Sequence, residues 1–122
     1  MFIIDFKKSK CLHYGINIHL LKPDILVLVV TKNNLYKLTK GHEDKYDVSI
    51  QGGKLFPEAK KIKFTGSTFG GSMLKIGWIG KGMLMEMYCV EDDKVYKTSG
   101  VMAARIIGDG WEYDMEWDDA IE

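Results

Sequence analysis

The chain has 122 residues, 46% of them hydrophobic and 28% charged, and its 17 basic and 17 acidic residues give a formal net charge of zero. This composition is typical of one globular domain, residues 1–122, that buries a core without disulfides or metals. Zero net charge argues against general binding to nucleic acid or an anionic membrane, and no apolar run approaches membrane-spanning length. Cys11 and Cys89 fit no metal spacing, and residues 1–8 lack a secretory pattern, so we expect a cytoplasmic protein, in the host cytoplasm if phage-encoded.

The first half of the chain predicts short strands separated by turn residues. Ile25–Val30 is β-branched and apolar on both faces, which is typical of a central strand. Lys32-Asn33-Asn34 predicts a turn that returns the chain antiparallel, because asparagine tolerates the left-handed conformation. The strands expected in this half are Phe2–Phe6, Ile16–Leu20, Ile25–Val30, Leu35–Leu38, Tyr46–Ile50 and Lys61–Thr65.

The second half continues in the same way, and Val101–Ile107 is its one ambiguous segment. Ser99 could cap a short helix and Gly108 could end it, but we favour a strand. The chain therefore predicts a mainly β protein: a small antiparallel sheet, as a sandwich or a partly closed barrel, with at most one short helix. Such a sheet leaves edges, so we expect a homo-oligomer. The strands expected here are Met73–Ile79, Met83–Val90, Val95–Thr98 and Trp111–Asp118, with Glu91–Lys94 as a hairpin loop.

Glycines and lysines cluster between Gly66 and Gly82. Glycine lets backbone N–H groups approach an anion, and a neighbouring lysine adds positive charge. The cluster matches neither a phosphate-binding loop nor a dinucleotide fingerprint, so glycines that serve turns, and a tryptophan that fills the core, stay open alternatives. The candidate residues for a phosphate or a base are Lys75, Trp78, Gly80, Lys81, Gly82 and Arg105.

The remaining chemistry-bearing residues predict no catalysis. His13, His19 and His42 have no metal-ligand spacing, and no serine lies in a nucleophile elbow. We therefore expect neither an enzyme, nor a metal, nor a cofactor. Four lysines, Lys54, Lys60, Lys61 and Lys63, make the middle of the chain basic.

The end of the chain alternates apolar and acidic residues from Trp111 to Asp118, as a strand with two different faces would. The acidic face is either a solvated surface or a ridge that imitates a nucleic-acid backbone and enters a basic channel on a partner protein. The candidate partner-binding residues are Glu112, Asp114, Glu116 and Asp118.

Gly77–Met83, together with Asp109–Glu112, resembles elements of the phage Thoeris anti-defence proteins, which sequester cyclic ADP-ribose-type signals. The resemblance implies a non-enzymatic oligomer whose ligand carries a pyrophosphate and a base, bound by backbone amides, Lys81, Arg105 and Trp78. The chain departs from the family pattern where Gly66–Ser72 replaces a helix.

These observations favour a small binding protein of phage or prophage type that counteracts host immunity by sequestering a nucleotide-derived molecule. Two alternatives remain. One is an inhibitor that binds a partner such as a nuclease through the acidic strand. The other is a structural or assembly protein.

Overall fold

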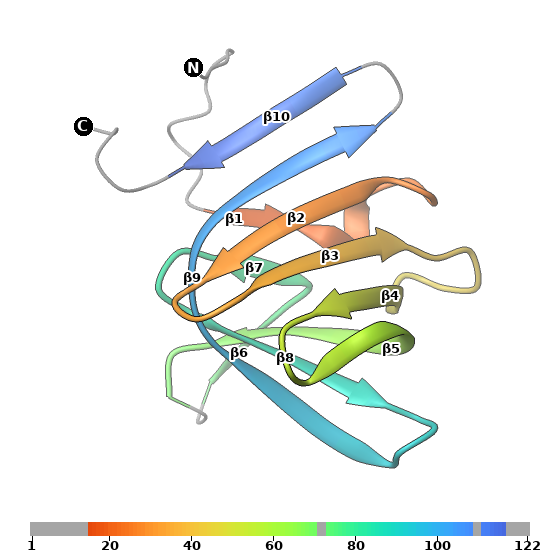
Figure 1. The fold of residues 1–122 in the computed structure, drawn as a ribbon. Coiled ribbons are helices and arrows are strands. Elements are labelled where there is room, and N and C mark those ends of the chain that lie inside the picture. The colour runs from red at the N-terminus through yellow and green to blue at the C-terminus, as the bar shows by residue number, and fades with distance from the viewer. Residues whose placement is uncertain (1–14, 71–72, 109–110, 117–122) are drawn as a thin grey trace.

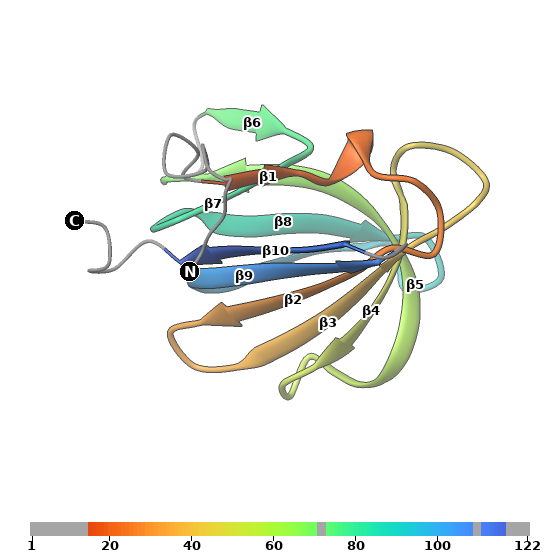
Figure 2. The same cartoon turned by 90° about the horizontal axis from the view of Figure 1, so that it is seen from above.

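The computed structural model describes residues 15–70, 73–108 and 111–116, which form ten strands and one short 3-10 helix (Figures 1 and 2). Every strand pairing in these ranges is antiparallel, so the expected mainly β fold is confirmed. The elements are β1 (Gly15–Asn17), η2 (Ile18–Leu20), β2 (Leu26–Thr31), β3 (Leu35–Lys40), β4 (Asp47–Gly52), β5 (Phe56–Thr68), β6 (Leu74–Ile76), β7 (Trp78–Gly80), β8 (Leu84–Cys89), β9 (Lys94–Gly108) and β10 (Trp111–Glu116).

The larger sheet has eight strands and partly closes into a ring. Its order is β10-β9-β2-β3-β4-β5-β6, and β8 joins the two sides by pairing with both β5 and β9. The strands β5 and β9 are long enough to turn a corner: the first half of β9 pairs with β8 and the second half with β2 (Figure 1). The strands β1 and β7 form a separate two-stranded ladder.

Alternating residues of the strands face a common core, because successive side chains of a strand point to opposite sides. On β2 the buried residues are Val27, Val29 and Thr31, while Val30 is exposed. This strand lies between β3 and β9, which confirms its predicted central place. The other core residues include Tyr36, Leu38, Val48, Ile50, Ile62, Phe64, Met85, Met87, Cys89, Ala104 and Ile106.

The ambiguous segment Val101–Ile107 is strand, and it continues the predicted strand Val95–Thr98 within β9. The predicted strand Ile16–Leu20 is wrong after Asn17. There the Asn17 side chain accepts the backbone N–H of His19 and starts η2. Asparagine caps of this kind compete with extended structure.

The predicted strand Met73–Ile79 is divided at Gly77, whose φ of 74° ends β6 before β7 begins. The acidic strand is present as β10, over Trp111–Glu116. The predictions for Phe2–Phe6, Trp117 and Asp118 lie outside the described residues. Within the described ranges, no helix has the length and apolarity that a membrane span requires.

Gly77 is required by its backbone conformation and by its neighbours. A Cβ atom there would lie 2.6 Å from Asn17 Oδ1 and 2.7 Å from His19 Nδ1. We expect Gly77→Ala to lower the free energy of unfolding by about 2 kcal/mol, because left-handed backbone penalises a side chain. Chemical denaturation measures this. At Gly70 a Cβ would meet nothing within 4 Å, so Gly70→Ala is the control and should change stability by less than about 1 kcal/mol. Equal effects of the two substitutions would contradict this account.

Candidate functional site

Two of the predicted ligand residues, Lys75 and Trp78, are in contact. The Lys75 ammonium lies 4.0 Å from the centre of the Trp78 ring. The indole also lies against backbone: a Cβ atom on Gly15 or on Gly80 would be 2.5 Å from its ring atoms. An aromatic ring that covers cross-strand glycines is a common stabilising device in sheets. Trp78 is therefore half-buried between glycine backbone and a lysine, and a base could stack on it only after Lys75 moved.

Two backbone amides of the turn after Gly80, those of Gly82 and Met83, already have partners. The Gly82 N–H donates to the Val101 carbonyl at 2.8 Å, and the Met83 N–H donates to the Gly80 carbonyl at 3.1 Å. An anion at this turn would therefore depend on the side chains of Lys75 and Lys81, both of which are exposed.

Arg105 is placed apart from that turn. It lies on β9, in register with Leu28 of β2 and Asp114 of β10. The turn meets β9 at Val101, and four residues of strand amount to about 13 Å. Among the acidic candidates, Glu112, Asp114 and Glu116 lie on β10 at one end of the sheet order, and Asp118 lies outside the described residues.

A hollow in the described residues lies elsewhere, beside β5. Its volume is about 660 Å³, and it adjoins a second hollow of about 320 Å³ that shares Glu43, Asp47 and Lys61. We call the two together the β5 groove. The loop between β3 and β4 contributes to both hollows, and the hairpin that joins β8 and β9 contributes to the larger one. The larger hollow is lined by Glu43, Asp47, Ala59, Lys60, Lys61, Ile62, Lys63, Val90 and Glu91.

The lysines of the β5 groove are held by carboxylates from these two loops. Lys61 Nζ lies 3.5 Å from Glu43 Oε2, and Lys63 Nζ lies 3.3 Å from Asp44 Oδ2. On the other side, Lys60 Nζ lies 3.0 Å from Asp92 Oδ2. Exposed ion pairs of this kind contribute about 0–1 kcal/mol, so the lysines can change partners at little cost.

Two of these carboxyl groups titrate below their ordinary range. Hydrogen bonds from the Lys60 ammonium and the Tyr96 hydroxyl hold the pKa of Asp92 below 3.8. Burial alone would raise the pKa of Asp44. The Tyr46 amide and the Lys63 ammonium outweigh burial and lower the pKa of that carboxyl. Both groups are therefore ionised at neutral pH and keep their lysines oriented.

The smaller hollow contains a histidine–carboxylate pair at its exposed end. His42 Nε2 lies 2.9 Å from Asp24 Oδ1, and Asp24 has a φ of 72°. A histidine held by a carboxylate is a general-base arrangement when a nucleophile adjoins it. Ser49 lines the same hollow, but no hydrogen bond among the described residues joins it to His42. The Ser67 hydroxyl, in the glycine cluster, donates to the Trp78 carbonyl instead.

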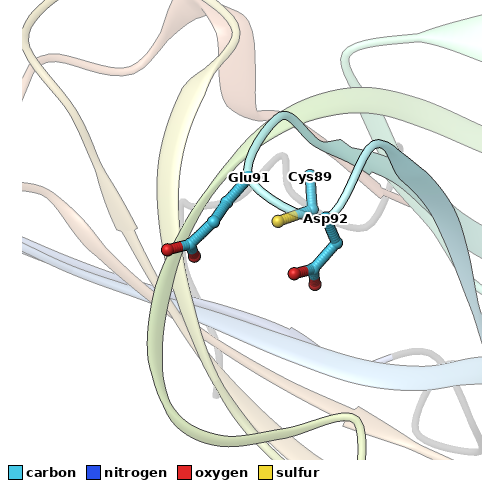
Figure 3. Close-up of side chains that lie close together, drawn as sticks. All are labelled: Cys89, Glu91 and Asp92. Carbon is cyan, nitrogen blue, oxygen red and sulfur yellow. The ribbon is translucent and has the colours of Figure 1, made fainter.

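Cys89, Glu91 and Asp92 gather at the tip of the β8–β9 hairpin, where one ligand atom from each lies within 4.8 Å of the others (Figure 3). The Lys60 ammonium lies 3.0 Å from the Asp92 carboxylate and 3.8 Å from that of Glu91. An ammonium therefore already lies against both carboxylates, and a metal ion would have to displace Lys60. The arrangement fits an ammonium that ties the hairpin to β5 better than it fits a metal.

Sequence reasoning missed the β5 groove. The run Lys60, Lys61 and Lys63 was visible as a basic segment, but its acidic partners lie in two other parts of the chain. The pairing of Asp24 with His42 likewise joins residues that no local motif connects.

The contacts of Trp78 predict a structural role that can be separated from ligand binding. We expect Trp78→Ala to lower the free energy of unfolding by about 2 kcal/mol or more, because it uncovers Gly15 and Gly80. Lys75→Ala removes only the cation–ring contact and should cost less than about 1 kcal/mol. Denaturant titration of both variants measures the difference, and a Trp78→Ala variant as stable as the parent would refute the packing role.

The tie between Lys60 and Asp92 predicts a pH dependence. A carboxyl whose pKa is lower when folded stabilises the protein above its unfolded pKa, and this stabilisation is lost as the pH falls through the folded pKa. We therefore expect Asp92→Asn to destabilise the protein at pH 7. The difference from the parent should shrink as the pH falls through the lowered pKa of this carboxyl. Melting temperatures between acid and neutral pH test this. Glu91→Gln is the control, since that carboxylate lies farther from Lys60 and should change little. A difference that does not shrink towards acid pH would argue against the ion pair as its cause.

No protein-family model matches the chain, and neither a curated protein nor a solved structure does. The resemblance to the Thoeris anti-defence proteins therefore rests on Gly77–Met83 and Asp109–Glu112, and Asp109 and Gly110 lie outside the described residues. What the protein binds has to be argued from its own geometry.

Proposed function

We propose that the protein is a non-catalytic binding protein that holds a small phosphorylated molecule in the β5 groove. The observation that carries this proposal is the presence of three lysines, Lys60, Lys61 and Lys63, in one hollow of the described residues. The hollow measures about 660 Å³, within the range of about 300–1,000 Å³ that is usual for small-molecule sites.

The charges of the β5 groove support an anionic ligand that displaces protein carboxylates. Lys61 and Lys63 are each paired with exposed carboxylates of the β3–β4 loop. A phosphate group offers two negative charges and three acceptor oxygens, so one group can replace both pairs. A ligand with two phosphates would reach Lys60 as well, and the displaced Glu43 would return to water.

Apolar side chains among the lysines support a ligand that also has a ring. Ala59, Ile62 and Val90 line the same hollow, and Val90 is largely exposed. Ligand sites usually combine apolar surface with a few polar groups that fix orientation. A nucleotide-derived molecule has both parts, because its base can cover Val90 while its phosphates meet the lysines.

The biological role that follows is sequestration. We propose that the protein withdraws a nucleotide-derived signal, as the Thoeris anti-defence proteins do, and in this way counteracts host immunity. Such a protein needs only affinity, since a molecule that is held need not be transformed. The turn that carries Lys75 and Lys81 is the second place where the same ligand could bind, and experiment distinguishes the two.

Thermal stability with added ligand tests the proposal. The probes are ADP, ADP-ribose, cyclic ADP-ribose, cyclic di-GMP and inorganic pyrophosphate. A ligand that binds the folded state at a hundredfold its Kd should add about 2.7 kcal/mol of stability. We expect Lys61→Ala with Lys63→Ala to abolish the stabilisation, and Lys75→Ala with Lys81→Ala, the matched control, to keep it.

Each outcome has a consequence. No stabilisation by any of the five probes would overturn the binding function. Stabilisation that survives in the first double variant and disappears in the second would move the site to the β6–β7 turn and reject the β5 groove.

A further inference from the structure

Among the described strands, the larger sheet ends at β6 on one side and at β10 on the other. Figure 1 shows β10 outermost next to β9, and Figure 2 shows β6 outermost above β7. An edge strand presents backbone N–H and C=O groups that can pair with another chain, and proteins usually blunt such edges or use them.

The β6 edge is apolar and basic. Four large apolar side chains on β6 and on the segment that joins it to β5 are exposed: Phe69, Met73, Leu74 and Ile76. Lys75 lies on β6 and Lys81 in the turn between β7 and β8, and the sequence between Gly66 and Met83 contains no acidic residue. Contiguous exposed apolar residues with one sign of charge are typical of an interaction surface.

The β10 edge has the opposite charge. Its six residues alternate apolar and acidic types, and the acidic ones are Glu112, Asp114 and Glu116. In the ladder with β9, Asp114 lies opposite Arg105, whereas Glu112 and Glu116 lie opposite Ile107 and Ala103. Two acidic positions of β10 therefore have no charged residue opposite them on β9.

We propose that the β6 edge of one copy pairs with the β10 edge of a second copy. Of the three possible edge pairings, this one alone brings opposite charges together. Two β6 edges would bring lysines together, and two β10 edges would bring carboxylates together. Such a contact joins different surfaces, so copies assemble head to tail into a ring or a short filament. The pairing does not use the β5 groove and stands whether or not that groove binds a phosphorylated ligand.

The association should be weak and sensitive to salt. The β6 strand has only three residues, so the backbone contributes few hydrogen bonds. We expect the mass in sedimentation analysis to rise with protein concentration at low salt. It should fall towards the monomer at 1 M salt, where charges are screened beyond about 3 Å.

A pair of charge-reversed variants tests the two edges. Lys75→Glu with Lys81→Glu makes both edges acidic, and Glu112→Lys with Glu116→Lys makes both basic. Each variant alone should associate at least about tenfold more weakly than the parent, because like charges then meet. Their equimolar mixture should regain the parent's association, because each acidic edge finds a basic one. Lys37→Glu with Lys54→Glu is the control, since it changes net charge equally at exposed residues outside β6 and β10.

Two results would overturn the proposal. One is parent protein that stays monomeric at low salt and high concentration. The other is a mixture of the two variants that associates no more strongly than either variant alone.

If circular dichroism shows that the first variant does not fold, Phe69→Ser with Met73→Ser takes its place. Both side chains are strongly exposed, and their replacement should weaken association without affecting the core. Unchanged association in that variant would reject β6 as a contact edge. Association equal to the parent's in either reversed variant would point to another surface.

Discussion

The pairing of β8 with two partners is the constraint on which the rest of the structure depends. Because β8 is bonded to both β5 and β9, the run β9-β2-β3-β4-β5 is drawn into a ring, and Met85, Met87 and Cys89 are enclosed. Without β8 the apolar sides of those two long strands would face water. The same pairing brings the β8–β9 hairpin beside β5, where Lys60 binds Asp92. The side of the β5 groove that this hairpin forms is thus a consequence of the pairing of β8 with both strands.

Strand positions could be predicted where the side-chain period alone decides them. Ile25–Val30 and Trp111–Glu116 are such cases. The first consists of consecutive apolar, mostly β-branched residues, and the second alternates apolar and acidic residues. Val101–Ile107 could not be decided in this way, since its structure depends on β2 and β10 as neighbours. The error at Ile16–Leu20 has a local cause: one hydrogen bond from the His19 amide to Asn17 ends the strand, and alternation does not detect a cap.

The contacts of the candidate sites also differ in whether they join residues close together or far apart in the sequence. The contact of Lys75 with Trp78 was not predicted, because an unbroken strand Met73–Ile79 would place these two residues on opposite faces. The left-handed bend at Gly77 brings them together. The β5 groove could not be predicted either, although its lysines were conspicuous. Whether a lysine-rich strand is a solvated face or the side of a hollow depends on loops from elsewhere in the chain. Here those loops supply Glu43 and Glu91, and only the closed sheet places them within 4.0 Å of lysines.

The burial of Cys89 makes its thiol a probe for the opening of the ring. The thiol lies fully enclosed on the strand that joins the two sides of the sheet. A soluble alkylating reagent can therefore reach it only in molecules whose β8 has parted from a neighbour. Where reclosing is faster than alkylation, its rate of modification relative to that of a free thiol measures the fraction of molecules in which the ring is open. In such a measurement a ligand that bridges β5 and the hairpin would slow the reaction, whereas one bound at the far edges would leave it unaltered.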